Sequence, residues 1–203
     1  MTYQLTASVR MEIKRRLETL PQRRLTATSE RSAGVLVPLC QVNGEASILF
    51  TKRSDRVGTH KGQVSFPGGM KDPGDASFID TALRETEEEI GYPREAVDIL
   101  GTFHEAQAIT GVRVVPVIGF LKDLKDLESL RLSQAEIDQA FTLSLAEILD
   151  PTKRKRQQLG PRQSAFVFEA GPFPVWGLTA YILEQVVREA LHLPFPSSQT
   201  ETS

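Results

Sequence analysis

An amphipathic helix with strand-like runs on both sides is the feature that most constrains how this chain can fold. Residues 77–90 read SFIDTALRETEEEI, and Gly91 follows at the position where a left-handed residue ends a helix. Ser77 with Asp80 three positions later resembles a capping box, and Asp75 is an alternative cap. At about 100° per residue, one side of this helix carries Ile79, Ala82, Leu83, Thr86 and Ile90. That side must be buried, so the helix is expected to cover a sheet.

Strand-like runs surround the helix in the sequence. Residues 33–39 (AGVLVPL) and 46–52 (ASILFTK) are separated by Asn43-Gly44, a turn pair favoured in hairpins. A polar loop is expected at 54–69, and its last four residues are FPGG. Further strands are expected at 97–103, 112–121 and 165–169. Strands before and after a central helix predict a mixed α/β sandwich.

Helices are expected at both ends of the chain as well. Residues 8–19 carry apolar residues four apart, which predicts an amphipathic helix, and a short helix is expected near 144–149. The final helix begins around Gly177 and ends near Leu191, and Trp176 just before it is expected in the core, with stacking on adenine as its alternative. We therefore expect an N-terminal helix packed on the domain (1–25), the domain itself (26–193) and a disordered Pro/Ser-rich tail (194–203).

Composition narrows the class of protein. The chain has 203 residues, 40% of them apolar and 25% charged, which is ordinary for one soluble domain. The net charge of −2 lacks the basic excess that nucleic acid or a membrane surface attracts, and no apolar run is long enough to span a bilayer. The expected location is the cytoplasm. The single cysteine, Cys40, excludes an intramolecular disulfide, and its setting (VLVPLC) predicts a buried thiol.

The charged side of the central helix is unusual. Glu85, Glu88 and Glu89 stand at positions i, i+3 and i+4, where like charges cost roughly 0.2–0.5 kcal/mol per pair. They also occupy the last turns, where the helix dipole prefers cations, and Arg84 is the local counter-charge. A solvated acidic face is the simplest interpretation of such a run. The functional interpretation is a site for Mg²⁺ or Mn²⁺, which take carboxylate oxygens as ligands.

The surrounding residues favour the functional interpretation. Residues 68–92 (GGMKDPGDASFIDTALRETEEEIGY) resemble the Nudix box, which is Gly, five residues, Glu, seven residues, then Arg-Glu-U-x-Glu-Glu-x-Gly-U with U bulky and apolar. The second half matches except for the polar Thr86. Counting from Gly69, the first acidic position holds Asp75, and eight residues rather than seven separate it from Arg84. In the family this acid mainly braces the loop against the helix arginine.

A second resemblance narrows the branch of the family. Residues 49–69 (LFTKRSDRVGTHKGQVSFPGG) are similar to the signature that coenzyme A pyrophosphatases carry before the Nudix box. The signature's second arginine falls on Gly58, and the nearest arginine is Arg56. Residues 111–120 and 175–183 also look like that branch. The positions that match in register are Thr51, Arg53, Ser54, Gly62, Phe66, Pro67, Gly68 and Gly69.

The resemblance implies a Nudix-type α/β/α sandwich with a mixed β-sheet. It also implies roles for four charged residues of the helix, Arg84, Glu85, Glu88 and Glu89. Glu85 and Glu89 would be the principal ligands of Mg²⁺ or Mn²⁺, with Glu88 joining directly or through water. Such ions neutralise phosphate oxygens and lower the pKa of a bound water, and a nearby carboxylate would act as general base. Glu88 is one candidate base and Glu136 another, with a plain surface glutamate as the alternative for Glu136. Arg84 is expected to orient the carboxylates and anchor the loop.

The substrate expected from the resemblance is coenzyme A or its thioesters, cleaved at the diphosphate to 3′,5′-ADP and 4′-phosphopantetheine or its acyl form. Gly58 keeps another nucleoside diphosphate derivative open, such as NADH, ADP-ribose or a sugar nucleotide. A non-catalytic module that senses a nucleotide is a third hypothesis, and a homodimer is suggested by family habit alone. The residues expected to contact the substrate are Arg53, Lys61, Gly68 and Gly69.

Overall fold

A mixed β-sheet forms the centre of the computed structural model, which describes residues 3–25, 31–55, 62–124, 126–160 and 163–196. Within these residues the main sheet has the strand order β3-β2-β1-β7-β5, with β4 also paired to β1, β6 to β7 and β8 to β2. Strands β1 and β7 run parallel, whereas β1 and β2 form the predicted antiparallel hairpin. The strands of this sheet are β1 (Ser32–Val42), β2 (Glu45–Arg53), β3 (Val64–Ser65), β4 (Gly68–Met70), β5 (Val97–Thr102), β6 (Ala106–Gln107), β7 (Arg113–Leu121) and β8 (Ile137–Ser144).

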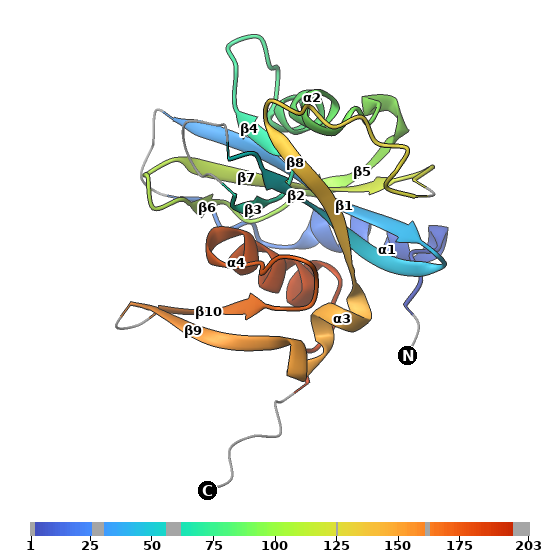
Figure 1. Ribbon diagram of the computed structural model, residues 1–203, viewed down its shortest axis with the longest axis vertical. Helices are drawn as coiled ribbons and strands as arrows, with labels where there is room; N and C mark the ends of the chain where they lie inside the picture. The colour runs from blue at the N-terminus through green and yellow to red at the C-terminus, as the bar shows by residue number, and fades with distance from the viewer. Residues whose placement is uncertain (1–2, 26–30, 56–61, 125, 161–162, 197–203) are drawn as a thin grey trace, which may run out of the picture.

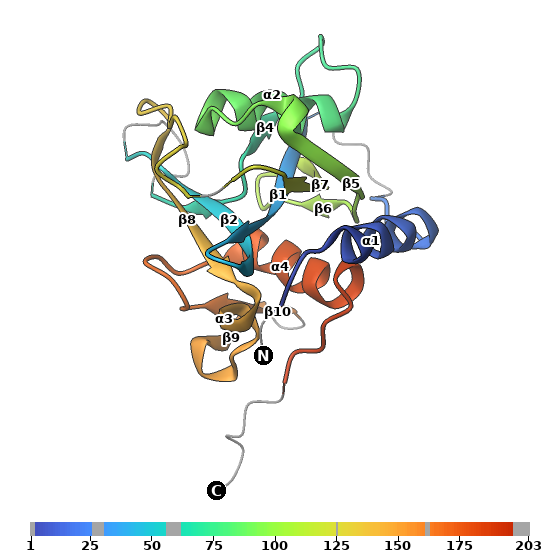
Figure 2. The same ribbon diagram turned by 90° about the vertical axis from the view of Figure 1, so that its right-hand side faces the viewer.

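Helices cover both faces of this sheet (Figures 1 and 2). Helix α2 (Phe78–Ile90) lies on one face, and α1 (Ala7–Thr19) and α4 (Gly177–Gln185) lie on the other. A second small sheet, the hairpin of β9 (Arg154–Gly160) and β10 (Gln163–Phe168), packs against α4. The remaining helical segments are α3 (Leu145–Leu149), two 3₁₀ turns at Arg94–Ala96 and Pro151–Lys153, and a π-helical turn at Val186–Ala190 that continues α4. The predicted α/β sandwich with a mixed sheet is confirmed.

The sheet divides the core into two parts, because successive side chains of a strand point to opposite faces. From β1, Leu36 and Cys40 pack on the α2 side, whereas Val37 and Leu39 pack on the side of α1 and α4. Cys40 is fully buried, and burial raises the pKa of its thiol to about 12, as the sequence predicted for a buried thiol. Within the described residues no helix is both long and apolar enough to cross a membrane.

The ends of α2 follow from its sequence. The Ser77 hydroxyl oxygen accepts a hydrogen bond from the Asp80 N–H at 3.2 Å, so Ser77 is the N-cap and Asp75 is not. Gly91 takes the left-handed conformation at φ 65°, and its N–H donates to the Glu87 carbonyl at 2.9 Å. The predicted apolar side is buried at Ala82, Leu83, Thr86 and Ile90. The helix is therefore fixed along the sheet from cap to cap.

The structure departs from the sequence expectations at strands and at one aromatic residue. The expected loop at 54–69 includes the short strand β3 and the start of β4, and strands β6, β8 and β9 were not expected. Their apolar alternation is weak because β8 exposes Asp138 and Gln139 at consecutive positions. Trp176 is 46% exposed rather than in the core, because Val175, fully buried, takes the inward position beside β10. Residues 197–203 of the expected tail lie outside the described residues.

Candidate functional site

The acidic side of α2 faces the glycine pair at the start of β4. The Gly68 N–H donates to the Glu89 carboxylate at 3.2 Å. A Cβ at Gly69 would lie 2.4 Å from the carboxyl carbon of Glu85, so the Glu85 carboxylate would have to shift to make room for it. The structure thus brings together four residues that the sequence singled out, and it explains the second glycine by close approach to a carboxylate.

Glu89 is the most buried of the acidic residues. Its side chain is 1% exposed, so the alternative interpretation of the charge run as a solvated acidic face does not apply to Glu89. Its second carboxylate oxygen accepts from a guanidinium nitrogen of Arg53 at 3.2 Å. Burial raises the pKa of Glu89 to about 8, the charges of Glu85 and Glu136 add to this, and Arg53 and the Gly68 N–H oppose it. In the folded chain, the negative charge of the Glu89 carboxylate is therefore only partly balanced by Arg53 and the Gly68 N–H.

Glu85 and Glu88 differ from Glu89 in their surroundings. The Glu85 side chain is 16% exposed and Glu88 is 56% exposed, and each carboxylate forms an ion pair with Arg84, at 2.9 Å and 3.1 Å. Burial raises the pKa of Glu85, Arg84 opposes the rise, and the charges of Glu88 and Glu136 add to it. Along one side of α2, the exposure of the carboxylates therefore increases from Glu89 to Glu85 to Glu88.

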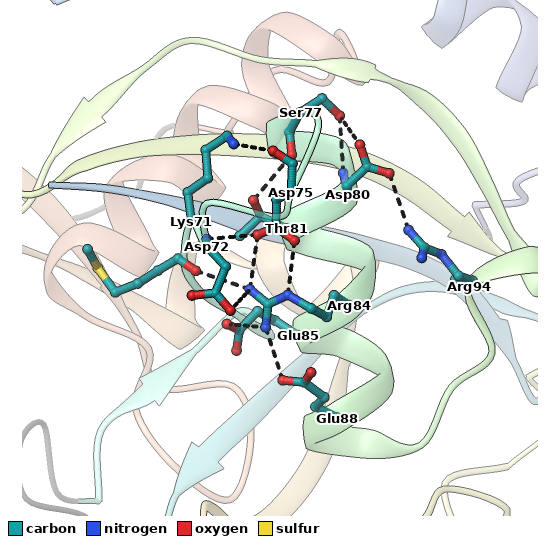
Figure 3. Close-up of polar contacts among 11 residues, drawn as sticks. Lys71, Asp72, Asp75, Ser77, Asp80, Thr81, Arg84, Glu85, Glu88 and Arg94 are labelled. Carbon is teal, nitrogen blue, oxygen red and sulfur yellow. Dashed lines mark hydrogen bonds and ion pairs between the residues drawn. The ribbon is translucent and has the colours of Figure 1, made fainter. Parts of the chain in front are cut away.

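Arg84 organises the loop before the helix (Figure 3). Its guanidinium forms a paired contact with both carboxylate oxygens of Asp75, at 3.0 and 3.1 Å, and donates to the Met70 carbonyl at 3.2 Å. These hydrogen bonds hold the pKa of Asp75 well below its usual range and raise that of Arg84. Asp75 therefore makes the expected brace despite the extra residue in the spacing.

The Asp75 brace leads to a testable difference between two aspartates of the same loop. We expect Asp75→Asn to lower the free energy of unfolding by about 1–3 kcal/mol, because it weakens a paired, charged contact of a side chain that is 7% exposed. Asp72 is 67% exposed and 3.9 Å from Arg84, so Asp72→Asn should cost less than about 0.5 kcal/mol. Urea unfolding of both variants measures the difference, and equal losses would contradict the assigned brace.

Glu136 lies beside the acidic helix although its segment is distant in sequence. The Ser133 N–H donates to the Glu89 carbonyl at 2.9 Å, and the Ser54 N–H donates to the Glu136 carbonyl at 2.7 Å. These bonds tie its segment to the end of α2 and to the end of β2. The side chain is half-buried, and its charge is among those that raise the pKa values of Glu85 and Glu89. Lys61, Gly58 and Arg56, which the sequence also singled out, lie outside the described residues.

The donor set of this site fits a hard divalent cation. Glu85, Glu88 and Glu89 offer carboxylate oxygens only, which suits Mg²⁺ or Mn²⁺. In the described part of the chain no three His, Cys, Asp or Glu side chains converge on one point as a complete cage. Mg²⁺ does not need one, because it keeps several waters and binds through one or two carboxylates together with substrate phosphates. The incompletely compensated Glu89 beside Glu85 meets that requirement.

The raised pKa of Glu89 predicts how the metal-free protein responds to pH. The folded protein favours the protonated, neutral form of the Glu89 carboxyl. Below pH 4.5, the pKa of Glu89 in the unfolded chain, the residue therefore does not lower the free energy of unfolding. As pH rises from there toward about 8, its pKa in the fold, the free energy of unfolding falls progressively. The full cost corresponds to at most about 5 kcal/mol. We expect Glu89→Gln to remove this decline, so the stability difference between variant and wild type in EDTA should grow from pH 5 to pH 9. A constant difference would show that Glu89 is ionised without penalty.

Comparisons with known proteins agree with this geometry. The NUDIX domain family matches residues 30–163. A protein of Mus musculus named mitochondrial coenzyme A diphosphatase NUDT8 is 44% identical over 165 residues, 77% of each chain. A protein of Cronobacter sakazakii named uncharacterized Nudix hydrolase NudL is 36% identical over 171 residues, 82% of this chain and 86% of its own. The crystal structure of a MutT/nudix family protein from Enterococcus faecalis has a TM-score of 0.52 at 17% identity, over 95% of this chain and 78% of its own, which supports the fold alone.

The matched region contains every part of the site that has been described. Arg53, the Gly68-Gly69 pair, the acidic helix and Glu136 all lie within residues 30–163. The fold, the glycine-lined acidic helix and the family match confirm the class of enzyme that the sequence predicted, a pyrophosphatase hydrolase. On this evidence the chain belongs to the Nudix family.

Proposed function

We propose that this protein is a divalent-metal-dependent pyrophosphohydrolase that cleaves the diphosphate of coenzyme A or its thioesters. The products would be 3′,5′-ADP and 4′-phosphopantetheine or its acyl form. The observation that carries the proposal is the pair Glu85 and Glu89, held against the glycines of β4 with Glu89 buried and incompletely compensated. The choice of coenzyme A rests on the signature at residues 49–69 and on the 44% identity to the mouse protein of that name.

The residues of α2 would divide the work of holding the metal. Glu85 and Glu89 would bind Mg²⁺ or Mn²⁺, and Glu88 would join them directly or through water. The bound ion would neutralise the diphosphate oxygens and lower the pKa of a water molecule. Arg84, fixed by its paired contact with Asp75, orients Glu85 and Glu88 and holds the loop before α2 against the helix. Arg84 therefore acts through the carboxylates rather than on the substrate.

A general base must take a proton from the attacking water. Glu88 is held by Arg84 at 3.1 Å, so its carboxylate is engaged in an ion pair. Glu136 is half-buried, and its charge acts on both Glu85 and Glu89, so its carboxylate lies near both proposed principal ligands. We therefore favour Glu136 as the base and retain Glu88 as the alternative.

The substrate diphosphate would lie against the glycine pair of β4, with Arg53 at its edge. Adjacent glycines allow the backbone to approach a ligand closely. The Arg53 side chain is 24% exposed at the end of β2, so its guanidinium can reach a bound phosphate. Arginine suits this role because its planar fork can contact two phosphate oxygens. Lys61 is proposed as a further phosphate contact on the sequence argument alone.

A substrate panel tests this function. The protein is incubated with Mg²⁺ or Mn²⁺ and coenzyme A, acetyl coenzyme A, NADH or ADP-ribose, and the products are identified by mass. We expect 3′,5′-ADP from the two coenzyme A compounds. Cleavage of NADH or ADP-ribose with coenzyme A intact would replace the substrate assignment, and nucleotide binding without turnover of any compound would favour a sensing module.

A further inference from the structure

Two arginines hold the buried carboxylates of the site in different ways. Arg84 is bound by both oxygens of Asp75, by the Met70 carbonyl and by two glutamates. Arg53 contacts Glu89 through a single guanidinium nitrogen at 3.2 Å and remains a quarter exposed. Moving Arg84 would break the loop, whereas moving Arg53 breaks one long contact. Of the two cations, Arg53 is the one that can leave its carboxylate.

Glu89 needs a positive charge in every state in which it is ionised. Its side chain is 1% exposed, and the neighbouring charges of Glu85 and Glu136 are both negative. Arg53 supplies the positive charge in the structure described here. A divalent ion bound by Glu89 would supply it as well, and two cations on one buried carboxylate repel each other. Arg53 and a metal ion therefore compete for the same role.

We propose that Arg53 is an exchangeable counter-cation for Glu89. It neutralises Glu89 while the metal is absent and leaves this carboxylate when the metal binds, so that its guanidinium becomes free to contact the substrate diphosphate. This inference rests on the proposed function for the identity of the metal ligands. It adds that metal binding to Glu89 is coupled to release of the Arg53 guanidinium, which can then contact the substrate phosphate.

Direct measurement of metal affinity tests the exchange without reference to turnover. Mn²⁺ is titrated calorimetrically into wild type, Arg53→Gln, Arg53→Lys and Lys52→Gln. Lys52 is the matched control, because it precedes Arg53 on β2 and its ammonium pairs with Asp138 at 3.1 Å and lies 5.2 Å from the centre of the Phe173 ring. Lys52→Gln removes the same net charge without touching Glu89.

Competition predicts that Arg53→Gln binds Mn²⁺ about tenfold more tightly than wild type, because the competing cation is gone. Lys52→Gln and Arg53→Lys should stay within about twofold of wild type, since both keep a cation beside Glu89. Unchanged or weaker binding by Arg53→Gln would overturn the exchange, because Arg53 would then be indifferent to the metal or would position Glu89 for it.

A second measurement does not depend on the folding of a variant. In isotopically labelled wild-type protein, the side-chain resonance of Arg53, assigned by its loss in Arg53→Lys, should shift as Mg²⁺ saturates the site. A resonance that stays unchanged at saturation overturns the exchange and leaves the proposed function intact. Absence of any Mg²⁺ or Mn²⁺ binding to wild type would instead overturn the metal assignment on which both rest.

Discussion

Glu89→Gln should reduce turnover by at least two to three orders of magnitude and leave the fold intact. Glutamine keeps the size of the side chain and can still accept from the Gly68 N–H, but it lacks the charge that a divalent ion requires. In metal-free protein at pH 9 the same change should raise the melting temperature, by about 2–4 °C for each kcal/mol recovered in a chain of this length, because a buried charge disappears.

Glu89→Gln is expected to lower turnover and raise thermal stability, and this combination of opposite changes distinguishes it from a variant that simply unfolds. They are measured by product release at saturating Mn²⁺ and by thermal unfolding in EDTA. Glu87→Gln is the matched control, since Glu87 is exposed on the same turn of α2 and no shift in stability is expected from it. Full activity in Glu89→Gln would remove Glu89 from the metal ligands.

Gly69→Ala should cause the second large effect, although it adds only one methyl group. The new Cβ would lie 2.4–2.5 Å from the carboxylate atoms of Glu85, so that carboxylate must move away from β4. We expect turnover to fall by about two orders of magnitude, because small displacements of a ligand group are costly in catalysis. Metal affinity should fall with it.

Gly74→Ala provides the comparison for this variant. Gly74 lies in the neighbouring loop, its Cβ would meet no atom within 4 Å, and its φ is not in the left-handed region. We expect this substitution to leave turnover within about twofold and stability unchanged or slightly higher. Equal losses in both variants would indicate a general intolerance of the loop rather than a clash with Glu85.

The sequence predicted the parts of the site that depend on local spacing. The caps of α2 at Ser77 and Gly91 and the hairpin of β1 and β2 were foreseen, because each rests on residues adjacent in the chain. The pairing of Asp75 with Arg84 was foreseen through the family resemblance, although the spacing between them differs by one residue. Whether the assigned residues perform catalysis stays a prediction.

The rest depends on contacts that spacing does not encode. Periodicity alone cannot show that Glu89 is buried, because burial is decided by β4 lying across that side of α2. Glu136 was named through the family resemblance, but the backbone bonds that hold its segment beside α2 and β2 leave no pattern in the sequence. Strand β8 was missed because an edge strand with consecutive polar residues resembles a loop.

The position of β1 has a consequence for how tolerant this protein is to insertions. Strand β1 pairs with β2, which ends at Arg53, and with β4, in the register Gly34 to Gly69 and Val35 to Gly68. It also packs beneath α2. A single added or deleted residue in β1 would therefore misalign the arginine, the glycines and the acidic helix simultaneously. Length changes that preserve activity should be confined to segments remote from this strand, such as the hairpin of β9 and β10.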